Sequence, residues 1–572
     1  MTVSEYIFNF LQNKGVKTVF MVSGSSAMWL TDALKRNGQI KAVCNQHEQA
    51  SVMAADIYSR LNGIPGAALV TIGPGATNAI TGVAQAYTDS SSVIVISGQA
   101  NSKLVNYVRE TGMRQHGTQS LELEKIISPI TKYFAVVMES EKIKYHLERA
   151  YFESADGRKG PVWLDIPIDI QNKQVPENME GFTVPARELE KIDTAKISTL
   201  LRESKKPLIL AGGGAVQEEI TALSHALSIP VVTSRMGIGN IISSDPLFVG
   251  RPGAYGDRAS HFAIQQCDLL LILGCRLSVS TIGYYPQRFG LNAVKIQVDI
   301  DKKELAKGDV PVDYKICTTV AAFADAVKNL QPPDCKEWIA HCAEMKAKYP
   351  VVLEEYRQRN PLNSYYFTQQ LSELVQENTV ITVDTGTVCN VVSQTWKIKK
   401  GQKYFISGGL SCMGFWAGTI GCMDHPAVAL AGDGATAMNI QEFATLKYYN
   451  LPIKLFVYQN NGYLLIRLNQ HNYMNDRFIG VGPDSGVKTP DYCKVAQAYG
   501  LPHVRITASD DIKKKISEVL EMEGPVICEV MLEEFAELAP RIASRVMPDG
   551  SLKAAEFDDL YPFLEKEGNQ NE

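Results

Sequence analysis

Residues 432–462 read GDGATAMNIQEFATLKYYNLPIKLFVYQNNG, and two of their polar side chains directly follow apolar runs. Asp433 follows the run at 427–431, and Asn460 follows the run at 453–459. Further strand-length apolar runs occur at 17–22, 66–72, 92–98, 207–212, 269–274, 294–300, 380–384 and 525–532, with helical stretches such as 47–61 and 439–450 between such runs. This alternation predicts an α/β fold of parallel sheets, in which ligands bind beyond the carboxyl ends of the strands.

Two polar stretches divide the chain into three such units. Residues 170–192 are rich in proline, glutamate and asparagine, and residues 329–338 precede a charged helical connector. We therefore predict three doubly wound parallel-sheet domains at residues 1–180, 190–335 and 360–546, followed by a tail at 547–572. The tail is acidic but contains leucines and aromatic residues, so two interpretations stay open: a solvated terminus, or a segment that packs over the body.

Composition excludes several classes of function. The 572-residue chain is too long for one hydrophobic core, and a net charge of −5 gives no general reason to bind nucleic acid or an anionic membrane. The apolar runs are too short to span a membrane, and the N-terminus lacks the pattern of a signal peptide. The 11 cysteines are scattered and form no CxxC pair. We expect a cytoplasmic protein without disulfides or structural zinc.

The turn around Asp433 is a candidate phosphate site. Gly432 and Gly434 allow the backbone to turn tightly on either side of the aspartate. The helix that follows presents unpaired N–H groups near Ala435 and Thr436, and such groups bind phosphate oxygens well.

The same stretch predicts a metal site. Asn460 comes 27 positions after Asp433, so two neighbouring strands would bring the side chains together. A carboxylate, an amide oxygen, the Gly462 carbonyl and phosphate oxygens form the all-oxygen shell that Mg²⁺ prefers. The alternative is that Asp433 caps a helix and that residues 460–462 form a plain turn. The spacing between GDG and NNG favours the metal site.

A second candidate is Glu48, which lies early on the largely apolar helix expected at 47–61. An acidic side chain that faces a core is costly unless it is paired or protonated, and burial would raise its pKa into the range that suits proton transfer. The alternative is an exposed first-turn glutamate favoured by the helix dipole. The segment TIGPGATN at 71–78 follows, with a turn that can be purely structural.

The GDG…NN pair together with the HEQ segment at 47–49 resembles the thiamine-diphosphate enzymes, and the resemblance covers essentially the whole chain. It implies thiamine diphosphate and Mg²⁺ as cofactors, with Glu48 as the acid that exchanges a proton with the aminopyrimidine ring. The metal ligands would be Asp433, Asn460 and Gly462. The resemblance implies these cofactor-binding residues: Pro74, Asn78, Thr385, Gly386, Thr387, Ser411, Met413, Gly432, Gly434, Ala435, Thr436, Asn460 and Gly462.

Within this family the chain looks most like acetolactate (acetohydroxyacid) synthases and their relatives in sugar and polysaccharide pathways. The segments GPVWLDIPIDIQ at 160–171 and HGTQSLE at 116–122 support this, and the resemblance implies that Gln119 lies beside the reacting centre as a second catalytic residue. It implies decarboxylation of a 2-oxoacid, with pyruvate as the expected donor, and transfer of the two-carbon unit to a carbonyl acceptor.

Departures from that pattern leave the acceptor open. Thr118 stands where the synthases carry a phenylalanine, and Asn469 stands where they carry a tryptophan that selects a second 2-oxoacid. Both changes make the acceptor pocket more polar. The alternatives are acetyl transfer to a nucleotide-linked keto-sugar, simple 2-oxoacid decarboxylation, and a catalytically inactive cofactor-binding homologue.

The resemblance also implies a homodimer or homotetramer, with sites at the subunit interfaces. In acetohydroxyacid synthases the central domain helps to bind FAD, so FAD is a further cofactor that the resemblance allows. A nucleotide-dependent oxidoreductase that uses the glycine turn at 211–215 is disfavoured, because the sequence has no nearby acidic residue to bind a ribose.

Overall fold

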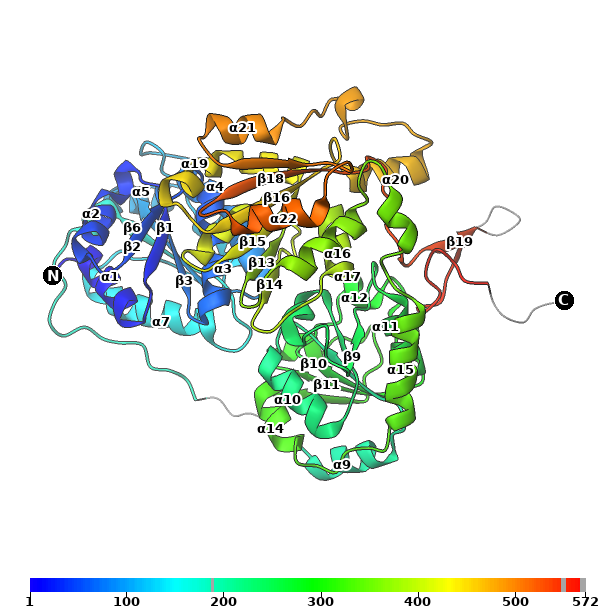
Figure 1. The fold of residues 1–572 in the computed structure, drawn as a ribbon. Helices are drawn as coiled ribbons and strands as arrows, with labels where there is room; N and C mark the ends of the chain where they lie inside the picture. Colours follow the sequence, from blue (N-terminus) through cyan, green and yellow to red (C-terminus); the bar gives the residue numbers. More distant parts are fainter. Residues whose placement is uncertain (187–189, 547–551, 566–572) are drawn as a thin grey trace.

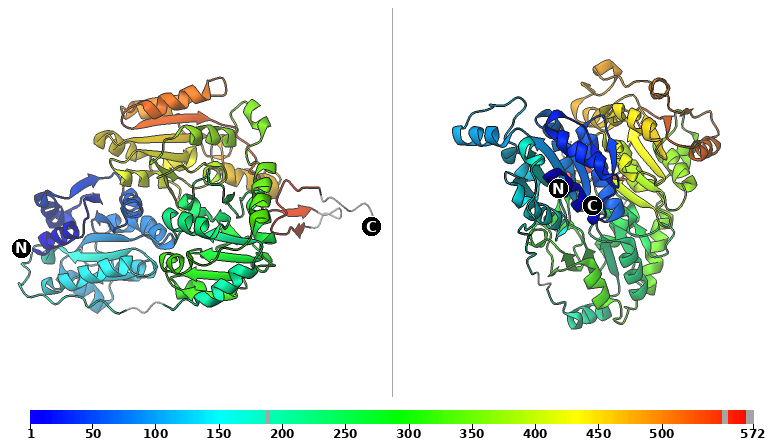
Figure 2. Two further views of the ribbon diagram at one scale, coloured as in Figure 1. Left: turned by 60° about the horizontal axis from the view of Figure 1, so that its bottom comes forward. Right: turned by 90° about the vertical axis from the view of Figure 1, so that its left-hand side faces the viewer.

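The computed structural model describes residues 1–186, 190–546 and 552–565. Three six-stranded sheets, each with all its strands parallel, form three α/β domains, as the sequence predicts. In Figure 1 the N-terminal domain is blue to cyan, the central domain is blue-green to green, and the C-terminal domain is yellow-green to orange. The right-hand view of Figure 2 shows the N- and C-terminal domains side by side, with the central domain below both.

The N-terminal sheet has the strand order β2-β1-β3-β4-β6-β5. Helices α1, α2 and α7 pack on one face of this sheet, and α3 and α4 pack on the other face, toward the C-terminal domain. The strands are β1 (Thr18–Met21), β2 (Lys41–Cys44), β3 (Gly66–Val70), β4 (Val93–Gln99), β5 (Tyr133–Val136) and β6 (Val162–Pro167). The helices are α1 (Val3–Asn13), α2 (Met28–Asn37), α3 (Glu48–Asn62), α4 (Pro74–Thr88), α5 (Ser102–Thr111), α6 (Glu124–Ile127), α7 (Ile143–Ala155) and α8 (Ile168–Gln171).

The central sheet has the order β12-β11-β10-β7-β8-β9, which is the order of dinucleotide-binding folds. Its strands are β7 (Pro207–Ala211), β8 (Val231–Thr233), β9 (Phe248–Gly250), β10 (Leu269–Leu273), β11 (Val294–Asp299) and β12 (Tyr314–Cys317). The helices of this part of the chain are α9 (Thr194–Glu203), α10 (Gln217–Leu227), α11 (Arg258–Gln266), α12 (Val279–Ile282), α13 (Lys302–Leu305), α14 (Val320–Val327) and α15 (Lys336–Lys348).

The C-terminal sheet has the order β14-β13-β15-β16-β18-β17. Its strands are β13 (Val380–Val383), β14 (Lys403–Ile406), β15 (Ala427–Gly432), β16 (Ile453–Gln459), β17 (His503–Ile506) and β18 (Val526–Met531). The helices are α16 (Ser364–Leu374), α17 (Thr387–Thr395), α18 (Asp433–Met438), α19 (Phe443–Tyr449), α20 (Leu464–Met474), α21 (Tyr492–Ala498) and α22 (Ile512–Glu521), with 3₁₀ segments η7 (Phe415–Cys422) and η8 (Ile440–Glu442). The helix expected at 439–450 therefore begins with a 3₁₀ turn.

One hydrophobic core is shared by the N- and C-terminal domains. It contains buried side chains of α3 and α4 together with those of η7, α19 and β16. Helix α3, which begins at Glu48, packs directly against η7. The helix that begins at Glu48 is therefore held against the C-terminal domain of the same chain.

The described part of the tail packs against the central domain, which settles the choice left open by the sequence. Phe557 stacks on the buried His261, with ring centroids 4.1 Å apart, and Arg258 donates a hydrogen bond to the Leu560 carbonyl at 3.1 Å. The antiparallel strands β19 (Ser544–Val546) and β20 (Leu552–Ala554) project beside this contact, as the left-hand view of Figure 2 shows. Tail residues 547–551 and 566–572 lie outside the described residues. No helix in the described ranges is long and apolar enough to cross a membrane.

Candidate functional site

Strands β15 and β16 bring the two ends of the opening motif together. They pair in parallel, with Gly432 opposite Tyr458, so Asp433 and Asn460 emerge at the same edge of the sheet. Asp433 is the first residue of α18, and its cap residue is Gly432.

Three donors orient the Asp433 carboxylate. Its Oδ2 accepts hydrogen bonds from the Gly462 N–H at 2.7 Å and from the Thr489 hydroxyl at 3.0 Å, and its Oδ1 accepts from the Gly434 N–H at 2.9 Å. The residue is 1% exposed, and burial raises the pKa of its carboxyl to about 6, although these three donors oppose the increase. The carboxylate is thus fixed in position and poorly hydrated, which suits a metal ligand.

Asn460 provides the test of whether these residues suit a metal ion. It is 5% exposed, and its side-chain Oδ1 has no hydrogen-bond partner among the described residues. A buried amide oxygen without a partner is costly, and a bound cation satisfies it. A carboxylate and a free amide oxygen at one sheet edge match the oxygen chemistry that Mg²⁺ requires.

Arg467 of α20 holds the loop that carries Asn460, and sequence reasoning missed it. The guanidinium is buried and donates to the carbonyls of Asn460 at 3.2 Å, Val481 at 3.1 Å and Asn461. A charged residue within an apolar run is rarely buried without partners, so Arg467 in the run LLIRL at 464–468 was the available signal. Its role is to fix the loop geometry.

The turn expected to reach the diphosphate begins at Asp384, a second residue that sequence reasoning missed. Thr385 and Gly386 are half-buried at the end of β13, and the buried Thr387 begins α17. The carboxylate of Asp384 accepts from the N–H groups of Thr385 at 2.7 Å and Trp416 at 2.9 Å. Burial raises the pKa of the Asp384 carboxyl to about 7. Its pattern, an aspartate after an apolar strand and near a glycine, is the pattern of Asp433.

The hydrogen bond from the Trp416 N–H to Asp384 also positions the preceding segment, which contains Ser411 and Met413. Ser411 is exposed with φ +56°, and Met413 is half-buried just before η7. The Asn439 amide donates to the Gly414 carbonyl at 2.9 Å, which joins this segment to the residues that follow α18. The expected cofactor-binding segments of the C-terminal domain therefore form one connected group.

The predicted phosphate-binding turn at the start of α18 is tightly packed. Ala435 and Thr436 are buried in this six-residue helix, and the indole N–H of Trp416 donates to the Thr436 carbonyl at 3.3 Å. A Cβ added to Gly434 would lie 2.1 Å from the Tyr463 ring, so only glycine fits this position.

The N-terminal domain gathers the second group of predicted residues. Glu48 is the first residue of α3 and is 8% exposed. It is thus a first-turn residue, but the alternative of an exposed side chain is wrong. The side-chain amide of Asn78 donates to Glu48 Oε2 at 3.0 Å. Pro74 and Asn78 lie in the first turns of α4, and both are exposed.

Gln119 lies against the glycine turn that precedes Pro74. A Cβ on Gly73, whose φ is +62°, would lie 2.8 Å from the Gln119 carbonyl oxygen. Gln119 itself is exposed and has φ +62°. The amide of Gln99 holds the same loop by donating to the Leu121 carbonyl at 3.2 Å. Glu48, Asn78 and Gln119 thus share one side of the N-terminal domain.

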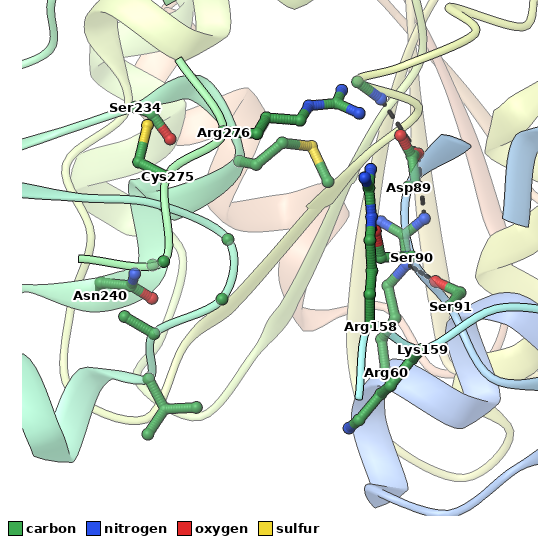
Figure 3. Close-up of a pocket in the computed structure, with 18 of the residues that line it drawn as sticks. Arg60, Asp89, Ser90, Ser91, Arg158, Lys159, Ser234, Asn240, Cys275 and Arg276 are labelled. Atoms are coloured by element: carbon green, nitrogen blue, oxygen red, sulfur yellow. Dashed lines mark hydrogen bonds and ion pairs between the residues drawn. The ribbon is translucent and has the colours of Figure 1, made fainter. Parts of the chain in front are cut away.

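A cavity of about 710 Å³ lies between the three domains. Figure 3 shows Arg60, Asp89 and Arg158 of the N-terminal domain on one wall, facing Ser234 and Arg276 of the central domain on the other. The central wall also contains the glycine turn 213–215, which precedes α10. Glycine turns, arginines and a helix start are the chemistry that binds a dinucleotide diphosphate.

Comparison with known families agrees with this division of the chain. The thiamine pyrophosphate enzyme N-terminal TPP binding domain matches residues 1–126, the central domain matches residues 194–327, and the C-terminal TPP binding domain matches residues 384–530. The matched segments contain the Glu48 group, the central glycine turn and the Asp433 group respectively.

Individual relatives point the same way. The chain is 30% identical to the probable acetolactate synthase large subunit of Methanocaldococcus jannaschii, over 98% of both chains. It is 29% identical to acetolactate synthase 1, chloroplastic, of Nicotiana tabacum, over 95% of this chain and 83% of that protein. The chain belongs to the thiamine pyrophosphate enzymes, with the N-terminal, central and C-terminal domains of that family, and it is distantly similar to acetolactate synthase large subunits.

Proposed function

We propose that this enzyme decarboxylates a 2-oxoacid, with pyruvate as the donor, and transfers the two-carbon unit to a carbonyl acceptor. The observation that carries the proposal is the buried, partnerless Asn460 Oδ1 at the same sheet edge as the fixed Asp433 carboxylate, in a family that binds thiamine diphosphate. These two oxygen ligands can hold a cation such as Mg²⁺, and a diphosphate commonly provides the further ligands of a protein-bound Mg²⁺.

We assign the roles of the residues from their positions together with the family resemblance. Asp433, Asn460 and the Gly462 carbonyl hold Mg²⁺, while the turns at 385–387 and 432–436 bind the diphosphate. When bound, thiamine diphosphate supplies an electron sink that stabilises the carbanion left by loss of carbon dioxide. Glu48 exchanges a proton with the aminopyrimidine ring, and the amide of Asn78 orients its carboxyl group. Gln119 lies beside the reacting carbonyl.

The acceptor is proposed from the departures noted in the sequence. The relatives are acetolactate synthases by name, and a second 2-oxoacid is one candidate acceptor. Thr118 and Asn469 are both exposed polar residues here, which favours a more polar acceptor such as a nucleotide-linked keto-sugar. Simple decarboxylation and a catalytically inactive homologue are the remaining alternatives.

We also propose the assembly, the location and a second cofactor on the grounds of the family resemblance. Two or four copies form a cytoplasmic homodimer or homotetramer, with Glu48 of one subunit completing the site of another. The cavity between the three domains is the candidate place for FAD, because it combines a glycine turn with arginines from two domains. Absorbance of the purified protein in the visible range tests for bound flavin.

Release of carbon dioxide from pyruvate, with thiamine diphosphate and Mg²⁺ present, tests the main proposal. The wild type should release it, and Glu48→Gln should lose activity by about 100-fold to 10,000-fold while it still binds the cofactor. Asp245→Asn, which removes a buried carboxylate of the central domain, is the matched control and should remain active. Product analysis with pyruvate alone and with keto-sugars then identifies the acceptor. Inactivity of the wild type with every donor and acceptor would contradict the proposal.

A further inference from the structure

A buried carboxylate of the C-terminal domain is bonded to the loop that ends at Glu48. Glu442 is fully buried in η8, and its Oε1 accepts the backbone N–H groups of Gln46 at 2.9 Å and His47 at 3.0 Å. Its Oε2 accepts from the Asn45 side-chain amide at 3.1 Å and from the Thr445 hydroxyl at 2.7 Å. Three of these four donors belong to the N-terminal domain.

The bonded loop is the segment that sets the start of α3. Gln46 and His47 immediately precede Glu48, and His47 is the N-cap residue of the helix, since its ring nitrogen accepts the Gln49 N–H at 3.2 Å. Two backbone N–H groups held by one oxygen atom leave this loop little freedom to move. A displacement of the loop therefore displaces the Glu48 carboxyl group.

We infer that Glu442 is a positioning residue for Glu48: through its bonds to residues 45–47 it sets the place of the acid that serves the cofactor. The inference rests on the proposed function, because Glu48 needs exact placement only if it exchanges a proton with thiamine diphosphate. Misplacement of a catalytic group by about 1 Å costs on the order of 100-fold in rate. Nothing in the resemblance of the chain to its family assigns this role to Glu442.

In a reciprocal contact, a carboxylate of the N-terminal domain holds a loop of the C-terminal domain that leads to predicted cofactor-binding residues. Asp89, at the end of α4 in the N-terminal domain, accepts the N–H groups of Gly408 at 3.1 Å and Gly409 at 2.6 Å. Figure 3 shows Asp89 paired with Arg60 on the cavity wall. The loop at 408–409 follows the second strand in the chain order of its sheet, as the loop at 45–47 does, and it leads to Ser411 and Met413. Each domain thus restrains the site loop of the other.

The same boundary offers a matched control. The hydroxyl group of Tyr449 accepts the Cys44 N–H at 2.8 Å and donates to the Ala42 carbonyl at 3.3 Å. This contact joins the same two domains, but it holds the end of β2 rather than the residues next to Glu48. If Glu442 only joined the domains, then Tyr449→Phe and variants of Glu442 would have effects of the same kind.

The first measurement uses the full chain without cofactor: amide hydrogen exchange of a peptide that covers residues 45–49. Glu442→Ala removes both acceptor atoms and should speed exchange in this peptide by about tenfold or more. Glu442→Gln should have a smaller effect, because its amide oxygen can still accept both backbone N–H groups. Tyr449→Phe should leave this peptide protected. Asp89→Asn should change exchange around 405–413 instead.

The second measurement is the rate at which bound thiamine diphosphate exchanges its C2 proton with deuterated water, in the absence of substrate. Glu442→Ala should slow this exchange by about tenfold or more, and Glu442→Gln by less, while Mg²⁺ and cofactor affinities change by less than about threefold. Tyr449→Phe should exchange at the wild-type rate. During turnover, kcat for pyruvate should fall in the same order, with KM little changed.

The outcomes separate a positioning role of Glu442 from a purely structural role. If Glu442→Ala loosens the loop but the C2 proton exchanges at the wild-type rate, Glu442 is structural only and the inference is overturned. Equal slowing by Tyr449→Phe and Glu442→Ala would overturn it as well. If Glu442→Ala does not fold, Glu442→Gln and Glu442→Asp decide through the same two measurements. If wild type and Glu48→Gln exchange the C2 proton equally, the proposed function fails and the role of Glu442 falls with it, even where the loop data show the contact.

Discussion

The N-terminal and C-terminal sheets share one plan. In chain order both have the strand arrangement 2-1-3-4-6-5, and a glutamine that ends the fourth strand of each is bonded to an acid on the sixth. Gln99 donates to Asp165 at 2.8 Å, and Gln459 donates to Glu529 at 3.2 Å. In both sheets the acid pairs with a residue of the fourth strand, and the glutamine lies two positions after that residue.

The two sheets differ in what their strand ends carry. The turn after the third strand contains Pro74 in the first sheet and Asp433 in the last. Gln99 supports the loop of Gln119 through the Leu121 carbonyl. In the C-terminal sheet the single hydroxyl hydrogen of Thr489 faces two acceptors, Asp433 Oδ2 at 3.0 Å and Gln459 Oε1 at 3.2 Å. The same scaffold therefore carries the proposed proton-transfer residues in one domain and the proposed metal ligands in the other. Function is decided by residues at the strand ends.

The largest effect should come from replacing Asp433. This charged residue follows the third strand of the C-terminal sheet, and the N-terminal sheet has no charged residue at the matching turn. Asp433→Ala is expected to weaken Mg²⁺-dependent binding of thiamine diphosphate on the order of 1,000-fold, because the site loses its only proposed carboxylate ligand. Titration calorimetry measures the affinity. Asp165→Asn removes a buried carboxylate from the N-terminal sheet and should leave this affinity unchanged. Equal losses in both variants would break the distinction between the sheets.

A smaller effect is expected from replacing Arg467, which supports the loop that carries Asn460. Arg467→Met leaves the carbonyls of Asn460 and Val481 without their buried donor, so the free energy of unfolding should fall by about 3 kcal/mol. Urea unfolding of the cofactor-free protein measures it. Added Mg²⁺ with cofactor should stabilise the variant less than it stabilises the wild type. An unchanged midpoint would show that the loop holds itself without Arg467.

The acid on the sixth strand of the N-terminal sheet, Asp165, should make the stability of the protein depend on pH. Burial raises the pKa of Asp165 to about 7 from an ordinary 3.8, so the folded protein holds this proton more tightly than the unfolded chain. The stability that Asp165 contributes is full below about pH 4 and is lost as the pH rises through about 7. The unfolding free energy of Asp165→Asn relative to wild type should therefore increase by about 2 kcal/mol from about pH 5.5 to about pH 8.

Glu529 is the comparison for that experiment. Arg505 donates to it at 2.9 and 2.6 Å, a partner that Asp165 lacks among the described residues. Glu529→Gln should lose stability at neutral pH, because the arginine loses its buried partner. If both variants gained stability as the pH rises, the arginine would not distinguish the two sheets.

The smallest effect is expected at Thr489, whose hydroxyl group orients Asp433. Thr489→Val keeps the shape of the side chain and removes the bond at 3.0 Å, so Mg²⁺ affinity should fall by about tenfold. Thr489→Ser retains the hydroxyl group and should bind Mg²⁺ as the wild type does. A loss in the serine variant equal to that in the valine variant would point to packing rather than to the hydrogen bond.

The strands predicted from the sequence are found in the structure, and most of the strands that were missed lie at sheet edges. Every expected apolar run forms a strand of one of the three sheets. Five of the missed strands, β2, β5, β12, β14 and β17, lie at sheet edges and carry half-exposed or exposed positions, so their apolar signal is weak. Among the remaining strands of the three sheets, β8 and β9 are only three residues long, and β6 lies within the segment GPVWLDIPIDIQ at 160–171.

The sequence by itself determined the α/β fold, the adjacency of Asp433 and Asn460, and Glu48 as a candidate. These inferences rest on local periodicity and on the rule that parallel strands end at one edge. Only the tertiary structure decided how that site is supported. Asn45 and Glu442 are 397 positions apart, and Arg467 and Asp384 act through backbone groups. Such contacts leave no periodic pattern in the sequence, because they depend on how the three sheets pack together.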